Sequence, residues 1–370
     1  MNRHRRAYGA LPSQHLRELM RSGFIFGGDE ARIGPASLDL TLSSELYEIE
    51  GVAQPMPGET VRDLLALIKL HEHKIEEPLR KQRTYLARLN ESLRLPEGIY
   101  GFCNPKSSTG RIDMHVRVIA DRVSRYDTVT PAGFAGELWL VISPRSFPVL
   151  IHEGETLTQL RLFNGDTRFN ELELQTALRE YKLMWYGEKN VPFEYADIEI
   201  KDGDGSLILT ADTGSSVVGY VCTEPDTVLD IAKISGYEPG EFFEPIHAIN
   251  DRIALKKDRF YILSSRERIR IPPGLASEMV PMDERSGDFR SHYAGFLDPG
   301  WGWGVAGEGF GRPFTLEVRP FEDLFVRAGQ PIAKIRFEYM LETPDISYDT
   351  RASNYLSQSG PRLGKQFKTR

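Results

Sequence analysis

The feature that most constrains the fold of this chain is an internal repeat. Residues 94–99 (RLPEGI) recur as residues 270–275 (RIPPGL), and each copy is followed by a Ser/Gly/Arg cluster, a Pro/Gly turn and a strand-like apolar pattern. Residues 153–163 then find a counterpart at 327–337, in the same order. Related segments that recur in one order along a chain indicate two copies of a single structural unit. The sequence therefore predicts a duplicated fold.

Each copy is predicted to be rich in β-strands, because apolar residues alternate along it as they do in half-buried strands. The alternating residues are Leu38, Leu40 and Leu42, then Leu138, Leu140 and Ile142, then Phe314, Leu316 and Val318. The 33 glycines and 23 prolines supply turns between many short strands. This pattern predicts a mainly β protein with two tandem jelly-roll domains, residues 1–190 and 191–370.

Only a few short helices are expected. Ser13 is a suitable N-cap for a helix that ends at Gly23. A second helix is predicted near residues 61–68, where apolar residues spaced by three and four would pack on a sheet. A third is predicted over residues 171–185, between the two copies.

Charge and cysteine content exclude several classes of protein. The chain has 46 Lys and Arg against 53 Asp and Glu, a net charge of −7, so it lacks the basic surface of a nucleic-acid-binding protein. No apolar stretch is long enough for a membrane-spanning helix, and Cys103 and Cys222 alone cannot build a disulfide framework. We therefore expect a cytoplasmic protein that binds neither nucleic acid nor a membrane. A small anionic ligand held by a few cations stays open.

Several common chemistries lack their residues. A zinc-dependent deaminase needs a His/Cys/Cys ligand set with a C-x-x-C pair, which two separate cysteines cannot supply, so we expect no zinc and no other protein metal site. His71 and His73, two residues apart, would point away from each other on a helix. The chain has no phosphate-binding P-loop and no nucleophile elbow. The glycine-rich run at 302–311 is interpreted as a mobile hairpin tip.

Two groups of residues can carry chemistry. Residues 106–111 (KSSTGR) place an ammonium group and hydroxyls on a turn, where they could contact a phosphate chain, although an ordinary turn has a similar composition. Glu317 lies between Leu316 and Val318, so strand alternation places its side chain on the opposite face. There the carboxylate can act as a general base or remain a solvated strand residue.

With further ordered blocks, these residues resemble the double-length bacterial dCTP deaminases of the dUTPase-like jelly-roll superfamily. The blocks are 11–17 (LPSQHLR), 35–40 (PASLDL) and 106–111 in the first half, and 294–301 (AGFLDPGW), 314–318 (FTLEV) and 347–361 (SYDTRASNYLSQSGP) in the second. The resemblance covers most of both halves. It implies zinc-independent deamination of dCTP to dUTP and ammonia in pyrimidine deoxynucleotide synthesis. It also implies Mg²⁺ bound with the triphosphate, and we expect a homo-oligomer that binds dCTP, dUTP or dTTP.

The same resemblance assigns catalytic roles. Glu317 would accept a proton from the water that attacks C4 of cytosine, and the backbone carbonyl of Ala294 would help to hold that water. Ser107 would hold the water or the phosphate side of the substrate. Arg111 would orient the reacting groups and support them electrostatically.

It also assigns substrate-binding roles. Asp298 would receive the deoxyribose, and Tyr355 and Gln358 would cover the phosphates. The other positions expected to contact the substrate are Lys106, Arg285 and Trp301.

Neither half carries the whole pattern. In the first half Thr130 replaces the Asp of the turn, and Val141 stands where the Glu should be. The second half keeps Ser286 and Arg290 at the right mutual spacing, but closer than usual to the following turn.

Two arrangements of the catalytic residues follow from this complementary loss. In a composite site, Ser107 and Arg111 would work with Glu317 of a second half, in the same or another chain. In the rival arrangement the second half uses its own Ser286 and Arg290, and the first half is a structural partner.

Other functions use the same fold and stay open at this point. A dUTP diphosphatase would activate water against the α-phosphate, alone or alongside deamination in a bifunctional enzyme. A non-catalytic nucleotide-binding protein would also account for the altered motifs of the first half.

Overall fold

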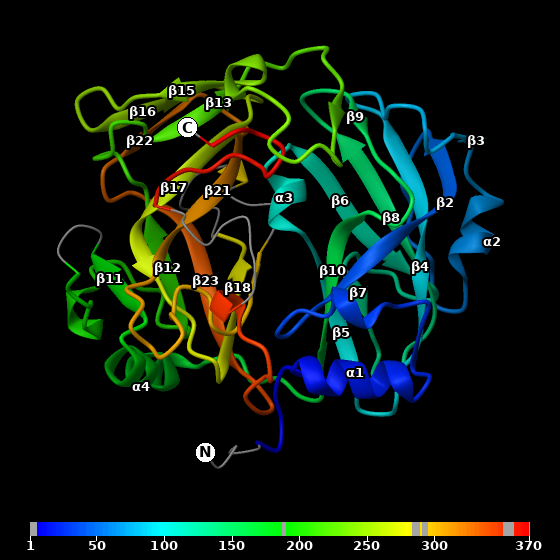
Figure 1. Cartoon of the computed structure of the whole chain (residues 1–370), viewed down its shortest axis with the longest axis horizontal. Helices are drawn as coiled ribbons and strands as arrows, with labels where there is room; N and C mark the ends of the chain where they lie inside the picture. The colour runs from blue at the N-terminus through cyan, green and yellow to red at the C-terminus, as the bar shows by residue number, and fades with distance from the viewer. Residues whose placement is uncertain (1–5, 187–189, 283–288, 291–294, 351–358, 370) are drawn as a thin grey trace. The chain divides into compact units, whose positions relative to one another are not determined.

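The computed structural model describes residues 6–186, 190–282, 289–290, 295–350 and 359–369. The chain forms two compact units, both mainly β (Figure 1). The N-terminal unit comprises residues 10–166, 224–238 and 364–370, and the C-terminal unit comprises residues 1–9, 167–223 and 239–363. The prediction of a mainly β fold with two related units is confirmed.

A single nine-stranded antiparallel sheet forms the body of the N-terminal unit. Its strand order is β6-β8-β4-β2-β10-β5-β7, and β1 pairs with β4 and β3 with β2. The strands are β1 Ile25–Phe26, β2 Leu38–Ile49, β3 Leu70–Glu72, β4 Thr84–Arg94, β5 Tyr100–Pro105, β6 Met114–Ala120, β7 Thr128–Val129, β8 Ala135–Pro144 and β10 Thr156–Phe163. A short parallel pair joins β9 Val149–Leu150 to β14 Leu229–Asp230. Through β14, a segment from the second half of the sequence belongs to this unit.

The C-terminal unit contains two larger sheets and a separate antiparallel pair of strands. The six-stranded sheet has the order β15-β13-β17-β21-β19 with β11 on β17, the four-stranded sheet has the order β12-β23-β18-β20, and β16 pairs with β22. The strands are β11 Met184–Tyr186, β12 Ser206–Thr210, β13 Gly219–Cys222, β15 Phe243–Ile246, β16 Arg252–Leu255, β17 Tyr261–Ile269, β18 Leu275–Val280, β19 Phe289–Arg290, β20 Phe296–Leu297, β21 Arg312–Pro320, β22 Leu324–Arg327 and β23 Pro331–Tyr339. Leu263 and Leu316 of the larger sheet share one apolar core with Ile335 and Phe337 of the smaller sheet. The unit is therefore a β-sandwich.

The helices are short, as predicted. They are α1 Ser13–Arg21, α2 Val61–Leu65, α3 Ser107–Gly110 and α4 Glu171–Tyr181, with 3₁₀ turns η1 Glu30–Arg32, η2 Tyr195–Asp197, η3 Pro239–Glu241 and η5 Tyr348–Thr350. Over the described residues, no helix has the length and apolar character needed to cross a membrane.

Two helix ends differ from the prediction. The N-cap of α1 is Pro12, and the Ser13 hydroxyl donates to Gln14 Oε1 instead of capping the helix. Helix α4 stops at Tyr181 because Lys182 adopts a left-handed conformation (φ 50°), and the following residues form β11 instead of a last helical turn.

The repeat is visible in a buried polar contact that both units contain. In the N-terminal unit, the backbone N–H and hydroxyl of Thr41 donate to the Glu91 carboxylate over 2.9 and 2.8 Å. In the C-terminal unit, the same two groups of Thr210 donate to Glu267. Burial raises the pKa of Glu91 and of Glu267, because loss of water disfavours the charged carboxylate more than the Thr donors stabilise it.

Glu267 predicts a pH dependence of stability. Below about pH 4.3 a glutamate is protonated in the unfolded chain, and Glu267 is then also protonated in the folded chain because burial raises its pKa. As the pH rises, the unfolded state ionises first, so the free energy of unfolding falls until the folded group ionises. Urea unfolding at a series of rising pH values should show the free energy of unfolding of wild type falling relative to that of Glu267→Gln. The fall should be about 1.4 kcal/mol for each unit by which folding raises the pKa of Glu267.

The exposed Glu322 provides the control. The variant Glu322→Gln should follow wild type at every pH. A constant stability difference between wild type and Glu267→Gln from acidic to neutral pH would contradict the prediction.

Candidate active site

Glu317 lies in the middle of β21, between β17 and β19 in the six-stranded sheet. In the β17 register it lies opposite Ile262, and only 2% of its surface is exposed. Leu316 and Val318 belong to the apolar core, so the predicted alternation of faces is confirmed. Glu317 is buried, however, and is not a solvated strand residue. A carboxylate held on a paired strand away from bulk water has the fixed orientation that a general base needs.

The pleat of β21 places Thr315 on the same face as Glu317. Thr315 is buried, and its Oγ1 accepts a hydrogen bond from the backbone N–H of Arg362 over 3.3 Å. At the other edge, β19 pairs with β21 so that the backbone of Arg290 lies opposite Arg319, two residues beyond Glu317. The strand therefore brings the backbones of residues 290 and 362 to positions near Glu317.

The turn before β21 contains Asp298 and Trp301. Asp298 directly follows β20 and is partly buried, and its backbone carbonyl accepts from the Trp301 N–H over 3.2 Å. The Trp301 ring packs on Phe314 with 5.1 Å between ring centroids and is part of the apolar core. Because Phe314 lies on the core face of β21, the Trp301 ring and Glu317 are on opposite faces of that strand. Trp301 therefore supports the turn from within the core.

Side chains from elsewhere in the unit contact the glycine-rich run, and its predicted mobility stays a prediction. The Arg270 guanidinium donates to the carbonyls of Gly307 and Gly309 over 3.0 and 2.9 Å. It also lies over the ring of Trp185, 5.1 Å from its centroid, and over the ring of Trp303, 4.4 Å from its centroid. Cation–π contacts and charge-assisted hydrogen bonds thus organise this loop.

Five predicted site residues lie outside the part of the chain that the structure describes. They are Arg285, Ser286, Ala294, Tyr355 and Gln358. Their assignments stay predictions, as does the role of the Arg290 side chain.

In the N-terminal unit, the 106–111 block forms one turn of helix. Lys106 precedes α3, Ser107 begins it, and Arg111 follows it with its N–H donating to the Ser107 carbonyl over 3.0 Å. The Lys106 ammonium forms an ion pair with Asp39 and donates to Thr156 Oγ1 over 3.0 Å. The structure therefore brings Lys106, Ser107 and Arg111 together, and it adds Asp39 to the group.

The end of the chain packs against this block. A Cβ added at Gly364 would lie 3.2 Å from Ile112 Cγ2 and 3.8 Å from Arg111 Cβ, so the backbone passes close to both residues. The backbone carbonyl of Lys365 accepts from the Ser235 N–H over 2.9 Å, and that of Gln366 accepts from the Gly236 N–H over 2.9 Å.

Lys365 is a cation that the sequence did not reveal. Burial lowers its pKa, the carboxylate of Glu155 opposes that change, and the charge of Lys106 adds to it. Two ammonium groups thus share one region with the carboxylates of Asp39 and Glu155. Both lysines would attract an anion there, whereas the carboxylates of Asp39 and Glu155 would oppose it, so an anion that binds Lys106 competes with Asp39. No motif in the sequence links Lys365 to residues 106–111, since they lie far apart along the chain.

The N-terminal unit also shows what stands in the place of Glu317. Val141 of β8 pairs with Leu86 of β4, in the same position of the repeat in which Glu317 of β21 pairs with Ile262 of β17. The structural register thus supports the equivalence of Val141 and Glu317. The first half has an apolar side chain where the second half has its carboxylate.

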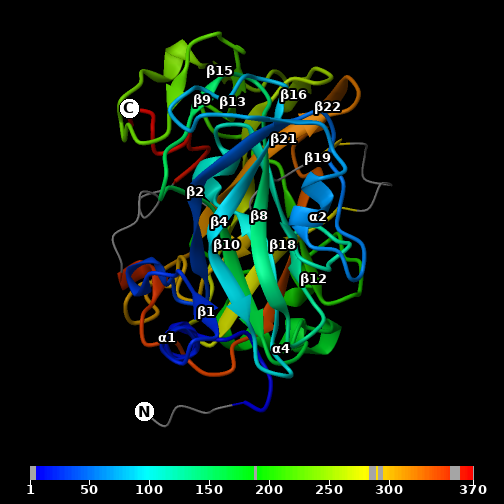
Figure 2. The ribbon, with the colours of Figure 1, turned by 90° about the vertical axis from the view of Figure 1, so that its right-hand side faces the viewer.

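The face around Val141 is closed by helix α2, which lies beside β8 (Figure 2). Val61 and Leu64 of α2 pack with Trp139 and Val141 in a separate apolar cluster, and Val141 is only 8% exposed. The sequence predicted that this helix packs on a sheet, and that prediction is confirmed.

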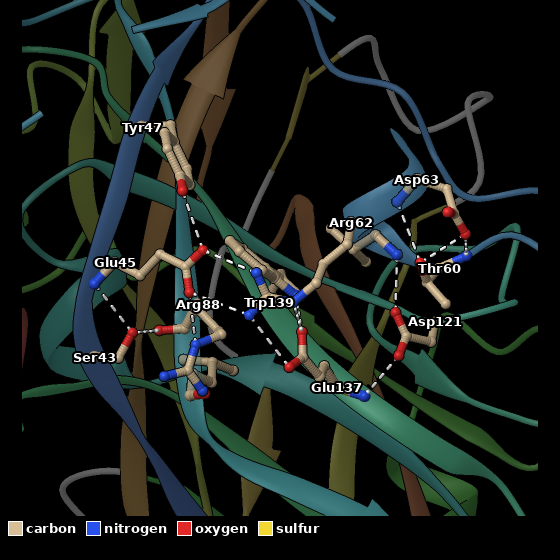
Figure 3. Close-up of polar contacts among 12 residues, drawn as sticks. Ser43, Glu45, Tyr47, Thr60, Arg62, Asp63, Arg88, Asp121, Glu137 and Trp139 are labelled. Atoms are coloured by element: carbon tan, nitrogen blue, oxygen red, sulfur yellow. Dashed lines mark hydrogen bonds and ion pairs between the residues drawn. The ribbon is translucent and has the colours of Figure 1, made fainter. Parts of the chain in front are cut away.

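A network of ion pairs holds the helix in place (Figure 3). Arg62 contacts Glu45 and Glu137 over 3.2 and 3.1 Å, and its guanidinium lies 5.3 Å from the Trp139 ring centroid. Glu45 is also bound by Arg88 over 2.8 Å. The counterpart of the Glu317 face is therefore a covered core in the N-terminal unit.

Comparison with known proteins gives one consistent family. The model of the 2′-deoxycytidine 5′-triphosphate deaminase (DCD) N-terminal domain matches residues 7–166, and that of the C-terminal domain matches residues 188–367. Among solved structures, the chain is similar to the crystal structure of 2′-deoxycytidine 5′-triphosphate deaminase from Agrobacterium tumefaciens. The two are 33% identical with a TM-score of 0.81, over 92% of this chain and 100% of that chain. A search of curated proteins finds no match.

The apolar surroundings of Val141 predict that a carboxylate is not tolerated there. Val141→Glu should lower the free energy of unfolding by about 3 kcal/mol at neutral pH, because the charge would be buried in an apolar cluster. The glutamine of Val141→Gln has nearly the same shape as glutamate but no charge, so this variant should lose less free energy of unfolding. Equal stability of the two variants in urea unfolding at neutral pH would show that the Val141 face is open to water.

Proposed function

This chain belongs to the 2′-deoxycytidine 5′-triphosphate deaminase family, and on that premise we propose that Glu317 is the general base of its reaction. The chain is a dCTP deaminase, a hydrolase that acts on the amino group of cytosine. The assignment of the base rests on one observation, which is that the two copies of the repeat carry different side chains at equivalent strand positions. Glu317 is a buried carboxylate on the strand after the Asp-Pro-Gly-Trp turn, whereas its counterpart Val141 cannot accept a proton.

In the proposed reaction, Glu317 accepts a proton from water as the water oxygen forms a bond to C4 of cytosine. The carboxylic acid returns that proton to N3, and the carboxylate then takes the second water proton from the new C4 hydroxyl and passes it to the departing amino group. The C4–N4 bond breaks, ammonia leaves, and the uracil ring of dUTP remains. One water is consumed, and Glu317 ends in its starting state.

In the composite arrangement, residues of the 106–111 block would bind and orient the substrate together with Glu317 of a second half, in the same or another chain. We propose that Lys106 contacts the triphosphate, Ser107 holds the water or a phosphate oxygen, and Arg111 supports the charge that develops during attack. Lys365 supports this assignment because its ammonium group lies in the same electrostatic environment as Lys106 and Asp39.

Mg²⁺ would enter as part of the substrate, bound to the triphosphate. Among the residues that the structure describes, no group of three or more His, Cys, Asp or Glu could hold a metal ion. The lysines of the N-terminal unit would then share the phosphate charge with the bound Mg²⁺.

The remaining proposed contacts follow the turn and the C-terminal segment. Asp298 would receive the deoxyribose, the Ala294 carbonyl would hold the attacking water, and Tyr355 and Gln358 would cover the phosphates. Trp301 would act through the turn, since its ring packs in the core.

The homo-oligomeric state and the cytoplasmic location stay proposals. Three large apolar side chains around the β16–β22 pair, Ile249, Phe321 and Phe325, are more than half exposed, which supports a contact with a second copy.

Replacement of the proposed base tests the mechanism. Glu317→Gln keeps the shape of the side chain but cannot accept the proton, so dUTP and ammonia formation from dCTP should fall by about 10²- to 10⁴-fold. Nucleotide binding should be retained. The exposed Glu322→Gln is the matched control and should keep wild-type activity.

Product analysis of the same samples separates the alternatives. Release of dUMP and diphosphate would reveal an additional diphosphatase. Deamination by Glu317→Gln within about tenfold of wild type, a change of about 1.4 kcal/mol in the barrier, would exclude Glu317 as the base.

A second pair of variants identifies the orienting arginine. Loss of a transition-state donor costs about 10²- to 10³-fold in rate, so Arg111→Ala should lose activity to this extent and Arg290→Ala should not. Arg111 is buried, so Arg111→Lys and thermal melting serve as controls for folding. An active Arg111→Ala together with an inactive Arg290→Ala would assign the role to the second half.

A further inference from the structure

Residues 347–350 of the C-terminal segment pack on the turn that precedes β21. The Tyr348 N–H donates to the Pro299 carbonyl over 2.9 Å. A Cβ at Gly300 (φ +89°) would lie 1.8 Å from Ser347 Oγ, so only a glycine leaves room for this contact. The turn and the segment are therefore fitted to each other within one unit.

Asp349 is the polar centre of this contact. Its Oδ1 accepts from Arg312 Nη1 over 2.7 Å and from the Gly302 N–H over 3.3 Å, and its Oδ2 accepts from the Gly304 N–H over 2.9 Å. Only 6% of the Asp349 side chain is exposed, against 14% for Arg312. A charge-assisted pair at this depth, with two further backbone donors, is stronger than an exposed ion pair.

The three donors come from both ends of one loop. Gly302 and Gly304 directly follow the turn that contains Asp298, whereas Arg312 is the first residue of β21, the strand of Glu317. Asp349 therefore ties the end of the turn to the beginning of the strand. The loop between them is held separately at its tip by Arg270, and at its base the Gly311 N–H donates to the Gly302 carbonyl over 3.1 Å, so Asp349 and this backbone bond together close the base of the loop.

We propose that Asp349 is a positioning residue that fixes the distance between the sugar-binding turn at Asp298 and the base Glu317. This inference rests on the proposed function, because it assumes those two roles. A nucleotide that is anchored through its deoxyribose presents C4 to Glu317 only if the turn and the strand keep one spacing. Small misplacements of reacting groups, on the order of 1 Å, can cost about 10²-fold in rate.

The variant Asp349→Asn tests the proposal. The amide keeps the shape, but it removes the charge and turns a donor towards the Gly302 or Gly304 N–H or towards Arg312. We expect kcat to fall at least tenfold. The Kd for dCTP, measured by calorimetry in the Glu317→Gln background to prevent turnover, should change less than threefold. A merely structural role would instead lower thermal stability and leave kcat of the folded enzyme unchanged.

The matched control is Asp323→Asn. Asp323 also pairs with a cation, Lys256 over 2.8 Å, and accepts a backbone N–H, that of Lys257 over 2.8 Å, but it lies after β21 and is exposed. This control should keep both kcat and Kd. If Asp349→Asn does not fold, Arg312→Lys keeps the charge with poorer geometry and should show the same fall of kcat in weaker form.

The outcomes separate this inference from the proposed function. Wild-type kcat in the folded Asp349→Asn variant, or in Arg312→Lys where the first variant does not fold, would overturn the positioning role and leave Glu317 as the base. A fully active Glu317→Gln would overturn both proposals. A tenfold loss confined to Asp349→Asn and Arg312→Lys, with the control unaffected, would support the positioning role.

Discussion

The pairing of β21 with β17 is the constraint on which the candidate site depends. In this register Glu317 lies opposite Ile262, while Leu316 and Val318 fill the core of the C-terminal unit. A shift by one residue would exchange the faces of the strand, placing a carboxylate in the core and a leucine at the site. The burial of the apolar residues therefore determines the direction in which the proposed base points.

Duplication has kept the framework of the two units and changed the face that carries the chemistry. Tyr85 and Tyr261 occupy corresponding positions, and each accepts a backbone N–H from the residue five positions before it, over 2.9 and 2.7 Å. Val141 and Glu317 also occupy corresponding positions, yet one lies under a helix and the other is a carboxylate. Strand pairing tolerates either side chain, because the ladder uses only backbone groups. The site could therefore diverge without loss of the fold.

The C-terminal segment contributes to both units. Residues 347–350 and 362 contact the turn and strand of the C-terminal unit. In the N-terminal unit, the backbone at Gly364 passes close to Arg111, and residues 365–366 accept hydrogen bonds from residues 235–237. Residues from distant parts of the sequence therefore complete each unit. This arrangement also affects the charge of Lys365, because the nearby ammonium group of Lys106 contributes to lowering its pKa.

The sequence alone determined the duplication, the mainly β fold and the face of Glu317, because strand alternation is a local property that each short segment displays. It also located residues 106–111, because a dense group of hydroxyl and basic side chains is visible without a structure. Only the tertiary structure decided that α2 covers Val141 and that Arg270 binds the glycine-rich run. It also decided that Lys365 interacts with Lys106 of the 106–111 block. These features are contacts between segments far apart in the chain. Their partners are set by packing and burial, which no local pattern records.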